Sequence, residues 1–398
     1  MDAADRLPRA VDVTVVGGGV IGTGTAYFLS TTTDLDVVLL ERDAVAAGST
    51  GDSSAIIRHI YGDRDIYSRM AAWSHEFYRN FEDETGESIA YEPNPLVRMG
   101  REGEPSGDVA QAGYDVLSGL DVSVSRYERD ELPDRYPMLA LDDVDFAVSD
   151  DDAAYSDATD VAGGFARAAQ AAGATVVTGV EVEDVVVDDD SVTGVDTDAG
   201  TVSTDDVVVA AGPWTPQLAD SVGVEIPIQP SREQILLLDP PADFVAESLE
   251  DLPTTSEPGS DWYMRPDFGD GVLIATHHSG DAVDPDTYKP DPDEDVVLDL
   301  VDDLSAFVPD LADARLRGQY CGVYSETPDR DFVLDQAGPS GCYFACGFSG
   351  HGFKQAPAVG TMMTDLVVDG DSDVADLEYF SLDRFADDPN GHAAAGDP

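Results

Sequence analysis

A glycine-rich turn between a short apolar strand and a helix constrains the fold of this chain more than any other feature. Residues 11–16 are predicted to form a short buried strand, residues 20–30 a helix with small side chains, and residues 36–40 a second strand. The turn between the first strand and the helix satisfies the pattern G-x-G-x-x-G over residues 17–22. This order of elements predicts a βαβ unit within a parallel sheet.

The turn suits the pyrophosphate of a dinucleotide. Glycine lets the backbone approach phosphate closely, and the helix N-terminus supplies amide donors and the positive end of a dipole. An acid that ends the second strand, nineteen residues beyond Gly22, can accept hydrogen bonds from ribose hydroxyls. The alternative is a glycine-rich turn that binds nothing. The cofactor contacts predicted in this unit are Gly17, Gly19, Val20, Ile21, Gly22, Glu41 and Arg42.

Three later segments distinguish FAD from NAD. Gly48-Ser49-Thr50 follows the second strand, the apolar strand 207–211 stops at Gly212-Pro213-Trp214, and a glycine loop spans residues 347–354. Together with the first turn, these segments resemble the D-amino-acid-oxidase-like (DAO) family of FAD enzymes over nearly the whole chain. The resemblance implies FAD as cofactor. It also implies cofactor contacts by Gly48, Ser49, Ala211, Gly212, Trp214, Gly347, Gly350, His351, Gly352, Phe353 and Lys354.

Within that family, the chain is most similar to monomeric sarcosine oxidase and N-methyltryptophan oxidase. The motifs that carry this likeness are residues 56–59 with Tyr61-Gly62, Thr327-Pro328-Asp329, and the 347–354 loop. The likeness implies that four side chains form the catalytic site. They are Arg58 and Lys354 as binders of a substrate carboxylate, with Tyr263 and His277 beside the substrate.

Physical chemistry supports these roles and also leaves alternatives. An arginine fork and a lysine point charge suit a carboxylate, and an imidazole can hold the reacting amine unprotonated. However, Arg58 and Lys354 could instead form structural ion pairs, and His277 and His351 could simply pack in the interior. If the segment is extended, we expect His278 to point away from His277.

Three departures from the sarcosine oxidase pattern affect the chemistry. The lysine that activates oxygen in the family falls at or beside Leu273, so we expect a dehydrogenase more than an oxidase. The cysteine that links the flavin falls on Gly322, beside Cys321, and we therefore expect FAD to bind without a covalent bond. The arginine and histidine that precede Arg58 in the family are replaced by Ala55 and Gly51, which makes the site less positive.

The charge of the chain restricts its partners and surroundings. Its 81 acidic and 21 basic residues give a net charge of −60, which repels nucleic acid and anionic membranes. We interpret the acids as a solvated surface adapted to a salty cytoplasm, where salt screens the repulsion. No run of about 18 apolar residues predicts a membrane span. The three cysteines predict buried thiols, and their spacing predicts no metal site.

These features predict an α/β fold with a doubly wound, Rossmann-like FAD-binding domain and an inserted mixed-sheet substrate domain. The FAD-binding domain is predicted to be discontinuous, and the substrate domain to fill the two gaps. The assigned ranges are 1–92, 150–226 and 325–398 for the FAD domain, and 93–149 and 227–324 for the substrate domain. A helical region over residues 65–84 is expected to turn five aromatic side chains toward the core, namely Tyr67, Trp73, Phe77, Tyr78 and Phe81.

The predicted reaction is oxidation of the C–N bond of a small, carboxylate-bearing amino acid, most consistent with a secondary or tertiary amine such as sarcosine. Hydride would pass to the flavin N5 atom, and the electron acceptor is unknown. Two alternatives stay open. One is a D-amino-acid or 2-hydroxy-acid oxidoreductase of the same family, and the other is a flavin-binding subunit without turnover of its own.

Overall fold

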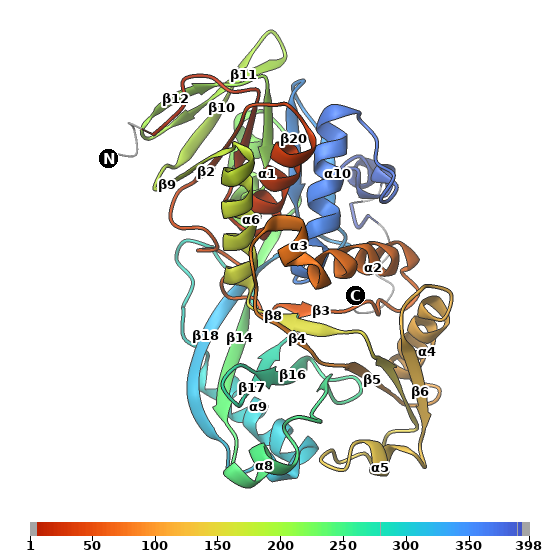
Figure 1. Cartoon of the computed structure of the whole chain (residues 1–398). Helices are drawn as coiled ribbons and strands as arrows, with labels where there is room; N and C mark the ends of the chain where they lie inside the picture. The colour runs from red at the N-terminus through yellow and green to blue at the C-terminus, as the bar shows by residue number, and fades with distance from the viewer. Residues whose placement is uncertain (1–5, 279, 388, 392–398) are drawn as a thin grey trace.

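A six-stranded sheet forms the centre of one half of the molecule, and its strands come from the beginning, the middle and the end of the chain. The computed structural model describes residues 6–278, 280–387 and 389–391 (Figure 1). The strand order is β19-β20-β13-β1-β2-β9, with parallel pairing throughout except between β19 and β20. The strands are β1 (Val13–Val16), β2 (Val37–Glu41), β9 (Thr175–Thr178), β13 (Asp206–Val209), β19 (Val333–Gln336) and β20 (Cys342–Cys346). The predicted βαβ opening is confirmed.

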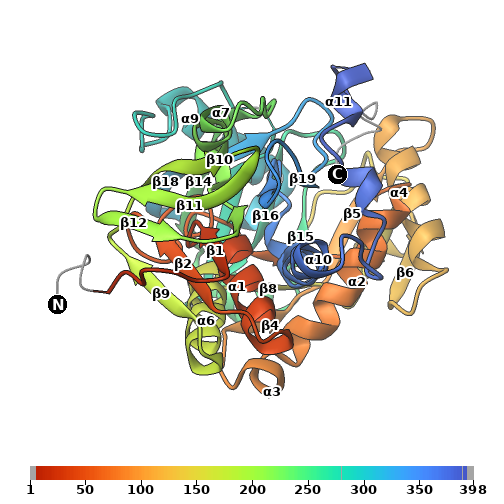
Figure 2. The ribbon, with the colours of Figure 1, turned by 90° about the horizontal axis from the view of Figure 1, so that it is seen from above.

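The two faces of this sheet carry different layers, as Figure 2 shows. Helices α1 (Val20–Thr32), α6 (Ala158–Ala172) and α10 (Ala356–Val368) cover one face, and α1 packs between the other two. The opposite face carries an antiparallel meander and a short helix, which are β10 (Val182–Asp188), β11 (Ser191–Thr197), β12 (Gly200–Ser203) and α7 (Thr215–Ser221). The mixed α/β class is confirmed, but strands cover most of the second face, where a doubly wound fold would have helices.

Valine explains why that meander packs on the sheet. Val185, Val195 and Val202 are buried in one cluster with Val38 and Val209 of the sheet. Branched side chains of this kind fit between two pleated surfaces. The face under the helices is instead filled by aromatic and long aliphatic side chains, including Phe28, Leu29, Phe165, Met362 and Met363.

A second, eight-stranded sheet forms the other half, in the order β18-β14-β17-β16-β15-β5-β7-β6. Residues 93–149 and 227–324, which the sequence assigns to a substrate domain, both contribute strands to this sheet. The division of the chain into an FAD domain and a substrate domain remains a proposal. The strands are β5 (Leu96–Gly100), β6 (Val124–Glu128), β7 (Phe146–Asp150), β14 (Gln229–Asp239), β15 (Thr254–Thr255), β16 (Trp262–Asp267), β17 (Gly271–Thr276) and β18 (Arg315–Glu326). Helix α9 (Glu294–Phe307) packs against it.

A small sheet lies between the two large ones in Figure 1. It consists of β3 (Ile56–Ile57), β8 (Ala154–Ser156) and β4 (Tyr91–Pro93), with β8 in the middle. Helices α2 (Asp65–Arg79) and α3 (Phe81–Thr85) follow β3 and carry the aromatic residues predicted to face the core. Four of those five are buried, but Trp73 is 39% exposed, and the prediction for it was wrong. Its ring stacks on Phe77 at the edge of the cluster.

Among the described residues, the remaining elements are four helices and four 3-10 turns. They are α4 (Pro105–Leu117), α5 (Leu132–Arg135), α8 (Ala242–Glu247) and α11 (Arg384–Asp387), with 3-10 turns η2 (Gly212–Trp214), η3 (Pro309–Leu311), η4 (Phe353–Gln355) and η5 (Leu377–Phe380). In the described part of the chain, none of the helices combines the length and the apolar character that crossing a membrane requires. All three cysteines are free and buried, as predicted.

Candidate cofactor and substrate site

A cavity of about 310 Å³ opens where the parallel strands of the first sheet end. Its wall includes the glycine turn between β1 and α1, the end of β2, and the turn after β13. Strands β14, β16, β17 and β18 of the second sheet close the other side. A crevice at the carboxyl ends of parallel strands is where open α/β sheets bind ligands. We refer to this space as the large cavity.

Close packing makes glycine necessary in the turn. Gly17 has a φ of +113°, and a Cβ atom there would lie 2.4 Å from the carbonyl oxygen of Ala210. Gly19 caps helix α1, and the Val20 amide donates a hydrogen bond to Thr50 Oγ1 at 3.0 Å. The N-terminus of a thirteen-residue helix therefore faces the large cavity, where amide donors and the helix dipole favour an anion.

The Glu41 carboxylate is fixed on the wall of the same cavity. Oε2 accepts a hydrogen bond from the Gly18 amide at 2.6 Å, and Oε1 accepts one from the Asp43 amide at 2.7 Å. These two bonds hold the side chain at the end of β2, beside the glycine turn. The carboxylate is thus positioned to accept hydrogen bonds from vicinal hydroxyls of a ribose.

Arg42 and Trp214 close one side of the large cavity. The Arg42 guanidinium carbon lies 4.1 Å from the centroid of the Trp214 ring. Asp286 joins them, because its Oδ1 accepts a hydrogen bond from Trp214 Nε1 at 2.8 Å and contacts Arg42 Nη2 at 3.2 Å. The sequence analysis did not identify Asp286, which approaches from a loop far along the chain.

The residues present fit FAD. Ser49 Oγ is buried on the cavity wall and has no hydrogen-bond partner within the protein, so it is available to a ligand oxygen. Next to it lie the amides of the glycine turn and the Glu41 carboxylate. These groups suit a pyrophosphate and a ribose, respectively, and would hold that part of the cofactor.

The glycine loop after β20 reaches the cavity through three of its six predicted cofactor contacts, Gly350, Gly352 and Phe353. Gly350 has a φ of +79°, and a Cβ atom there would meet the Tyr324 ring at 2.4 Å. Gly347 does not line the cavity; a Cβ atom on it would lie 2.5 Å from the Thr327 side chain. The cofactor contacts predicted in the first unit and in the segments after β2 and β13 line the large cavity, with the exception of Gly22. A Cβ atom on Gly22 would lie 2.0 Å from the carbonyl oxygen of Gly17, so this glycine allows the close packing of the turn on the helix.

His351 lies behind the loop, and its side chain is not part of either cavity wall. The ring packs against Tyr67 and Phe332, and Nε2 lies 2.9 Å from the Arg330 carbonyl oxygen. Burial, with Lys354 as a further cause, lowers the pKa of His351 well below its ordinary value. The structure therefore gives this predicted cofactor contact a packing role with a neutral ring.

A smaller cavity of about 60 Å³ adjoins the large one. All four residues predicted to form the catalytic site line it, namely Arg58, Tyr263, His277 and Lys354. The two cavities share the wall residues Ser54, Tyr263, Tyr324 and Gly350. A ligand in the small cavity would therefore lie beside one in the large cavity, across Tyr263, Tyr324 and the glycine loop.

The two predicted carboxylate binders come from separate elements and are both buried. Arg58 follows β3, and its guanidinium donates to the Ile60 carbonyl and lies 4.2 Å from the Tyr61 ring centroid. Lys354 lies in η4, directly after the glycine loop. Their exposed fractions are 5% and 7%, so the cavity holds two cations where solvent screening is weak.

His277 lies among aromatic rings just beyond the end of β17. Its ring meets Tyr263 edge to face at 5.7 Å, and Nδ1 lies 3.5 Å from the Tyr324 hydroxyl. We expected His278 to point away from His277 if the segment were extended, and the structure does not meet that condition. The strand ends at Thr276 and His278 has a φ of +55°, so the two imidazoles lie 4.1 Å apart.

The sequence analysis missed several wall residues. Arg98 of β5 and Tyr324 of β18 line the small cavity, whereas Asp52 and Glu233 line the large one. Burial raises the pKa of Asp52 to about 6, and burial also raises that of Glu233. A basic residue inside the apolar run 96–100 was the one available signal for Arg98.

The positions that depart from the family pattern are also visible. Leu273 is buried in an apolar cluster with Ile235 and Ala275. Ile235 and Ala275 line the large cavity, and Leu273 lies behind them. Gly322 lines that cavity, whereas Cys321 does not and is buried beside it on β18. In the described residues, no group of three or more His, Cys, Asp or Glu side chains is arranged to hold a metal ion.

Comparisons with known proteins identify the family of the chain. The model of the DAO family, described as FAD dependent oxidoreductase, matches residues 12–366. A monomeric sarcosine oxidase from a Bacillus strain is 29% identical over 385 residues, which cover 94% of this chain and 96% of that protein. N-methyl-L-tryptophan oxidase from Escherichia coli is 24% identical, with 94% and 99% covered.

The fold is shared with a solved structure. The L-proline dehydrogenase from P. horikoshii superimposes with a TM-score of 0.86 at 23% identity, covering 96% of this chain and 99% of that one. At this level of identity the likeness concerns the fold. The predicted resemblance to sarcosine oxidase and N-methyltryptophan oxidase is confirmed by the sequence relatives.

Proposed function

The chain belongs to the DAO family of FAD-dependent oxidoreductases, and from that premise we propose that it oxidises the C–N bond of a small N-substituted amino acid such as sarcosine. One observation carries the proposal. Arg58 and Lys354, two buried cations, line a small cavity together with Tyr263 and His277, and this cavity adjoins the one that fits FAD. Relatives named for sarcosine and N-methyltryptophan support the N-methyl substrate class.

In the proposed mechanism, the two cations anchor the substrate and thereby fix its reacting carbon. The Arg58 fork and the Lys354 ammonium bind the carboxylate with charge-assisted hydrogen bonds. The C–N bond then lies between Tyr263 and Tyr324, at the opening to the large cavity. FAD, held in the large cavity, would supply the acceptor for the hydride, and so for the two electrons, that leaves the carbon next to nitrogen. Anchoring matters because small displacements of the reacting atoms slow such a transfer strongly.

His277 is proposed to keep the amine ready for reaction. A neutral imidazole near the substrate nitrogen accepts its proton, so that nitrogen keeps the lone pair that becomes part of the C=N bond. The substrate loses one hydride and one proton, and water then hydrolyses the imine to an amine and a carbonyl compound. Tyr324 orients the ring through its contact with Nδ1.

We further propose that FAD binds without a covalent link and is reoxidised mainly by an acceptor other than oxygen. Gly322 on the cavity wall has no nucleophile, and burial raises the pKa of the Cys321 thiol to about 11, which disfavours the reactive thiolate. Leu273, where the family resemblance places the lysine that activates oxygen, is instead buried in an apolar cluster. Acid denaturation should therefore release all the yellow colour from the protein pellet.

A D-amino-acid or 2-hydroxy-acid substrate would use the same carboxylate clamp, and a flavin subunit without turnover would need none. The decisive experiment mixes the purified flavoprotein anaerobically with a panel of N-methylamino, D-amino and 2-hydroxy acids. Loss of the visible flavin absorption with the N-methyl class supports the proposal. Bleaching only by another class assigns that class instead, and no bleaching by any compound contradicts enzymatic turnover of these substrates.

A further inference from the structure

We propose that Arg98 is a specificity-determining residue that binds a second acidic group of the substrate. The preferred substrate would then be an N-alkyl amino acid with two carboxylates, such as the N-methyl derivative of aspartate or glutamate. The inference depends on the proposed function for the reaction at the C–N bond, and adds to it the class of side chain that the site selects.

The wall of the small cavity differs in charge from the rest of the molecule. In the whole chain, acids outnumber bases by 81 to 21. The described wall of the small cavity reverses this balance, because it contains Arg58, Arg98 and Lys354 and no aspartate or glutamate. A cavity lined by one sign of charge concentrates ligands of the opposite sign. In such an acidic protein, this reversal indicates an anionic ligand.

Strand β5 carries the Arg98 side chain on the face opposite to its core residues. Val97 and Met99 are buried in the core of the second sheet, on the face that packs against other strands and α9. Leu96, Val97 and Arg98 of β5 all line the small cavity. Because side chains alternate along a strand, the Arg98 side chain points to the face opposite to that of Val97 and Met99. Its charge reaches the same region as that of Arg58, since both guanidiniums lower the pKa of the Tyr61 hydroxyl against the dominant effect of burial.

The three basic side chains of the small cavity can bind two carboxylates. Arg58 and Lys354 suffice for one carboxylate, as a bidentate fork and a point charge. A substrate with a second carboxylate can reach Arg98 as well, whereas sarcosine has only the one carboxylate that Arg58 and Lys354 bind.

The size of the cavity is compatible with a small diacid. The small cavity has a volume of about 60 Å³, and one water molecule needs about 10–15 Å³ of such volume. The space thus corresponds to a few waters, or one small amino acid, and it opens into the large cavity at the reacting end. The hydroxyl-bearing residues Thr254, Thr255 and Ser256 complete the wall.

The test compares diacids with their neutral isosteres. We expect kcat/KM to be at least tenfold higher for N-methyl-L-aspartate than for N-methyl-L-asparagine, or for N-methyl-L-glutamate than for N-methyl-L-glutamine. Arg98→Gln should remove this preference, and Arg98→Lys should retain part of it. Arg101→Gln, just beyond β5 and outside the cavity wall, is the matched control. Equal kcat/KM within both pairs, or a preference that survives Arg98→Gln, would overturn the inference.

A binding measurement separates this inference from the proposed function. Succinate and its monoamide, succinamate, can be titrated into the flavoprotein at constant salt while the visible flavin spectrum is followed. We expect succinate to bind at least tenfold more tightly, and Arg98→Gln to equalise the two. Equal affinities in the unmodified protein would refute the role of Arg98, even if N-methyl amino acids reduce the flavin. Failure of every amine to reduce the flavin would contradict only the proposed reaction.

Discussion

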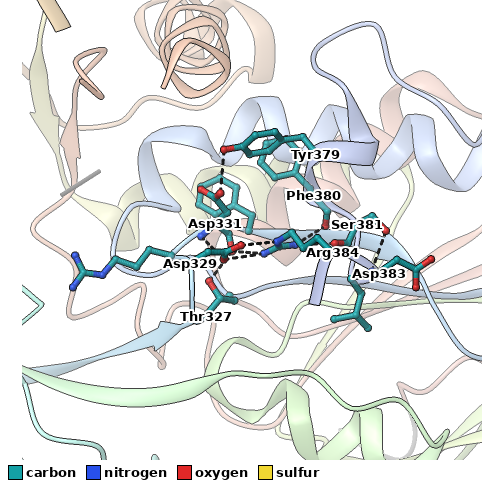
Figure 3. A network of polar contacts seen from close by, with 12 residues as sticks. Thr327, Asp329, Asp331, Tyr379, Phe380, Ser381, Asp383 and Arg384 are labelled. Carbon is teal, nitrogen blue, oxygen red and sulfur yellow. Dashed lines mark hydrogen bonds and ion pairs between the residues drawn. The ribbon is translucent and has the colours of Figure 1, made fainter. Parts of the chain in front are cut away.

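The Arg384 guanidinium grips the Asp329 carboxylate with two parallel hydrogen bonds (Figure 3). Nε lies 2.8 Å from Oδ2 and Nη2 lies 3.2 Å from Oδ1, and both side chains are buried. Arg384 also donates to the carbonyls of Phe380, Ser381 and Asp331. Asp329 belongs to the motif that precedes β19, so this pair ties helix α11, near the C-terminus, to the strand beside the cofactor loop.

Breaking this pair should destabilise the protein. Arg384→Ala would leave the Asp329 carboxylate buried beside Asp331, and removal of one partner of a buried pair typically costs about 3–5 kcal/mol. Chemical unfolding in molar KCl measures the effect. The control is Arg69→Ala, which removes an exposed pair with Asp65 and should cost less than about 1 kcal/mol. Equal losses in the two variants would contradict the structural role.

Local patterns explain why the first half of the molecule was predictable. β1, α1 and β2 appear where apolar runs and a glycine turn predicted them, because each is a contiguous signal. The pairing of β14 with β18 was not predicted, since the two strands lie far apart in the chain and β14 buries the polar run 232–234. Arg98 was missed for a related reason, since β5 lies far along the chain from Arg58, Tyr263, His277 and Lys354, with which it shares the cavity wall.

The residues of the candidate site were predicted through the family resemblance. Contacts between residues that lie far apart in the sequence could not be predicted in this way. The positions of Arg58 and Lys354 follow from motifs, whereas no periodicity in the sequence reveals that Tyr324 and His277 meet. The direction of His278 was predicted from an extended segment, but the strand ends one residue before His277. A positive φ at a histidine is rare and cannot be foreseen from alternation.

Salt should stabilise the fold strongly. At a net charge of −60, self-repulsion opposes the compact state, and molar salt reduces the Debye length to about 3 Å. We expect the Tm, followed by tryptophan fluorescence, to rise steeply between dilute buffer and molar KCl. Sucrose, which strengthens burial without screening charge, is the control and should help much less. A Tm that does not change with KCl would refute the interpretation of a protein adapted to high salt.

Asp52 should make stability depend on pH. Burial raises the pKa of Asp52 in the folded protein to about 6 from an ordinary value of 3.8. The stability that its protonated form contributes to the folded state is therefore lost as the pH rises through the folded pKa. Relative to Asp52→Asn, the apoprotein should lose about 1 kcal/mol between pH 5 and pH 7.5, allowing for partial solvent screening. Denaturant unfolding of both proteins at the two pH values tests this. A difference that stays constant or changes in the opposite direction would contradict the raised pKa.

Reoxidation by oxygen should be slow compared with reduction by substrate. The cavity wall near Leu273 is apolar, and the first electron transfer to oxygen creates an anion that such surroundings do not stabilise. The flavin is reduced anaerobically by substrate and then mixed with aerated buffer or with dichlorophenolindophenol. We expect the dye to react much faster, and Leu273→Lys to narrow the gap without changing the reduction rate. Reoxidation by oxygen as fast as substrate reduction would defeat this prediction.

The central claim is that Arg58 anchors the substrate carboxylate beside the flavin. The most direct measurement is the substrate dependence of anaerobic flavin reduction in the unmodified protein and in Arg58→Gln, at equal FAD content. Loss of one partner of a buried charge-assisted bond costs about 2–5 kcal/mol, so the apparent affinity for the carboxylate substrate should fall at least tenfold while FAD binding is unchanged. An Arg58→Gln protein with unaltered substrate affinity and reduction rate would contradict the account.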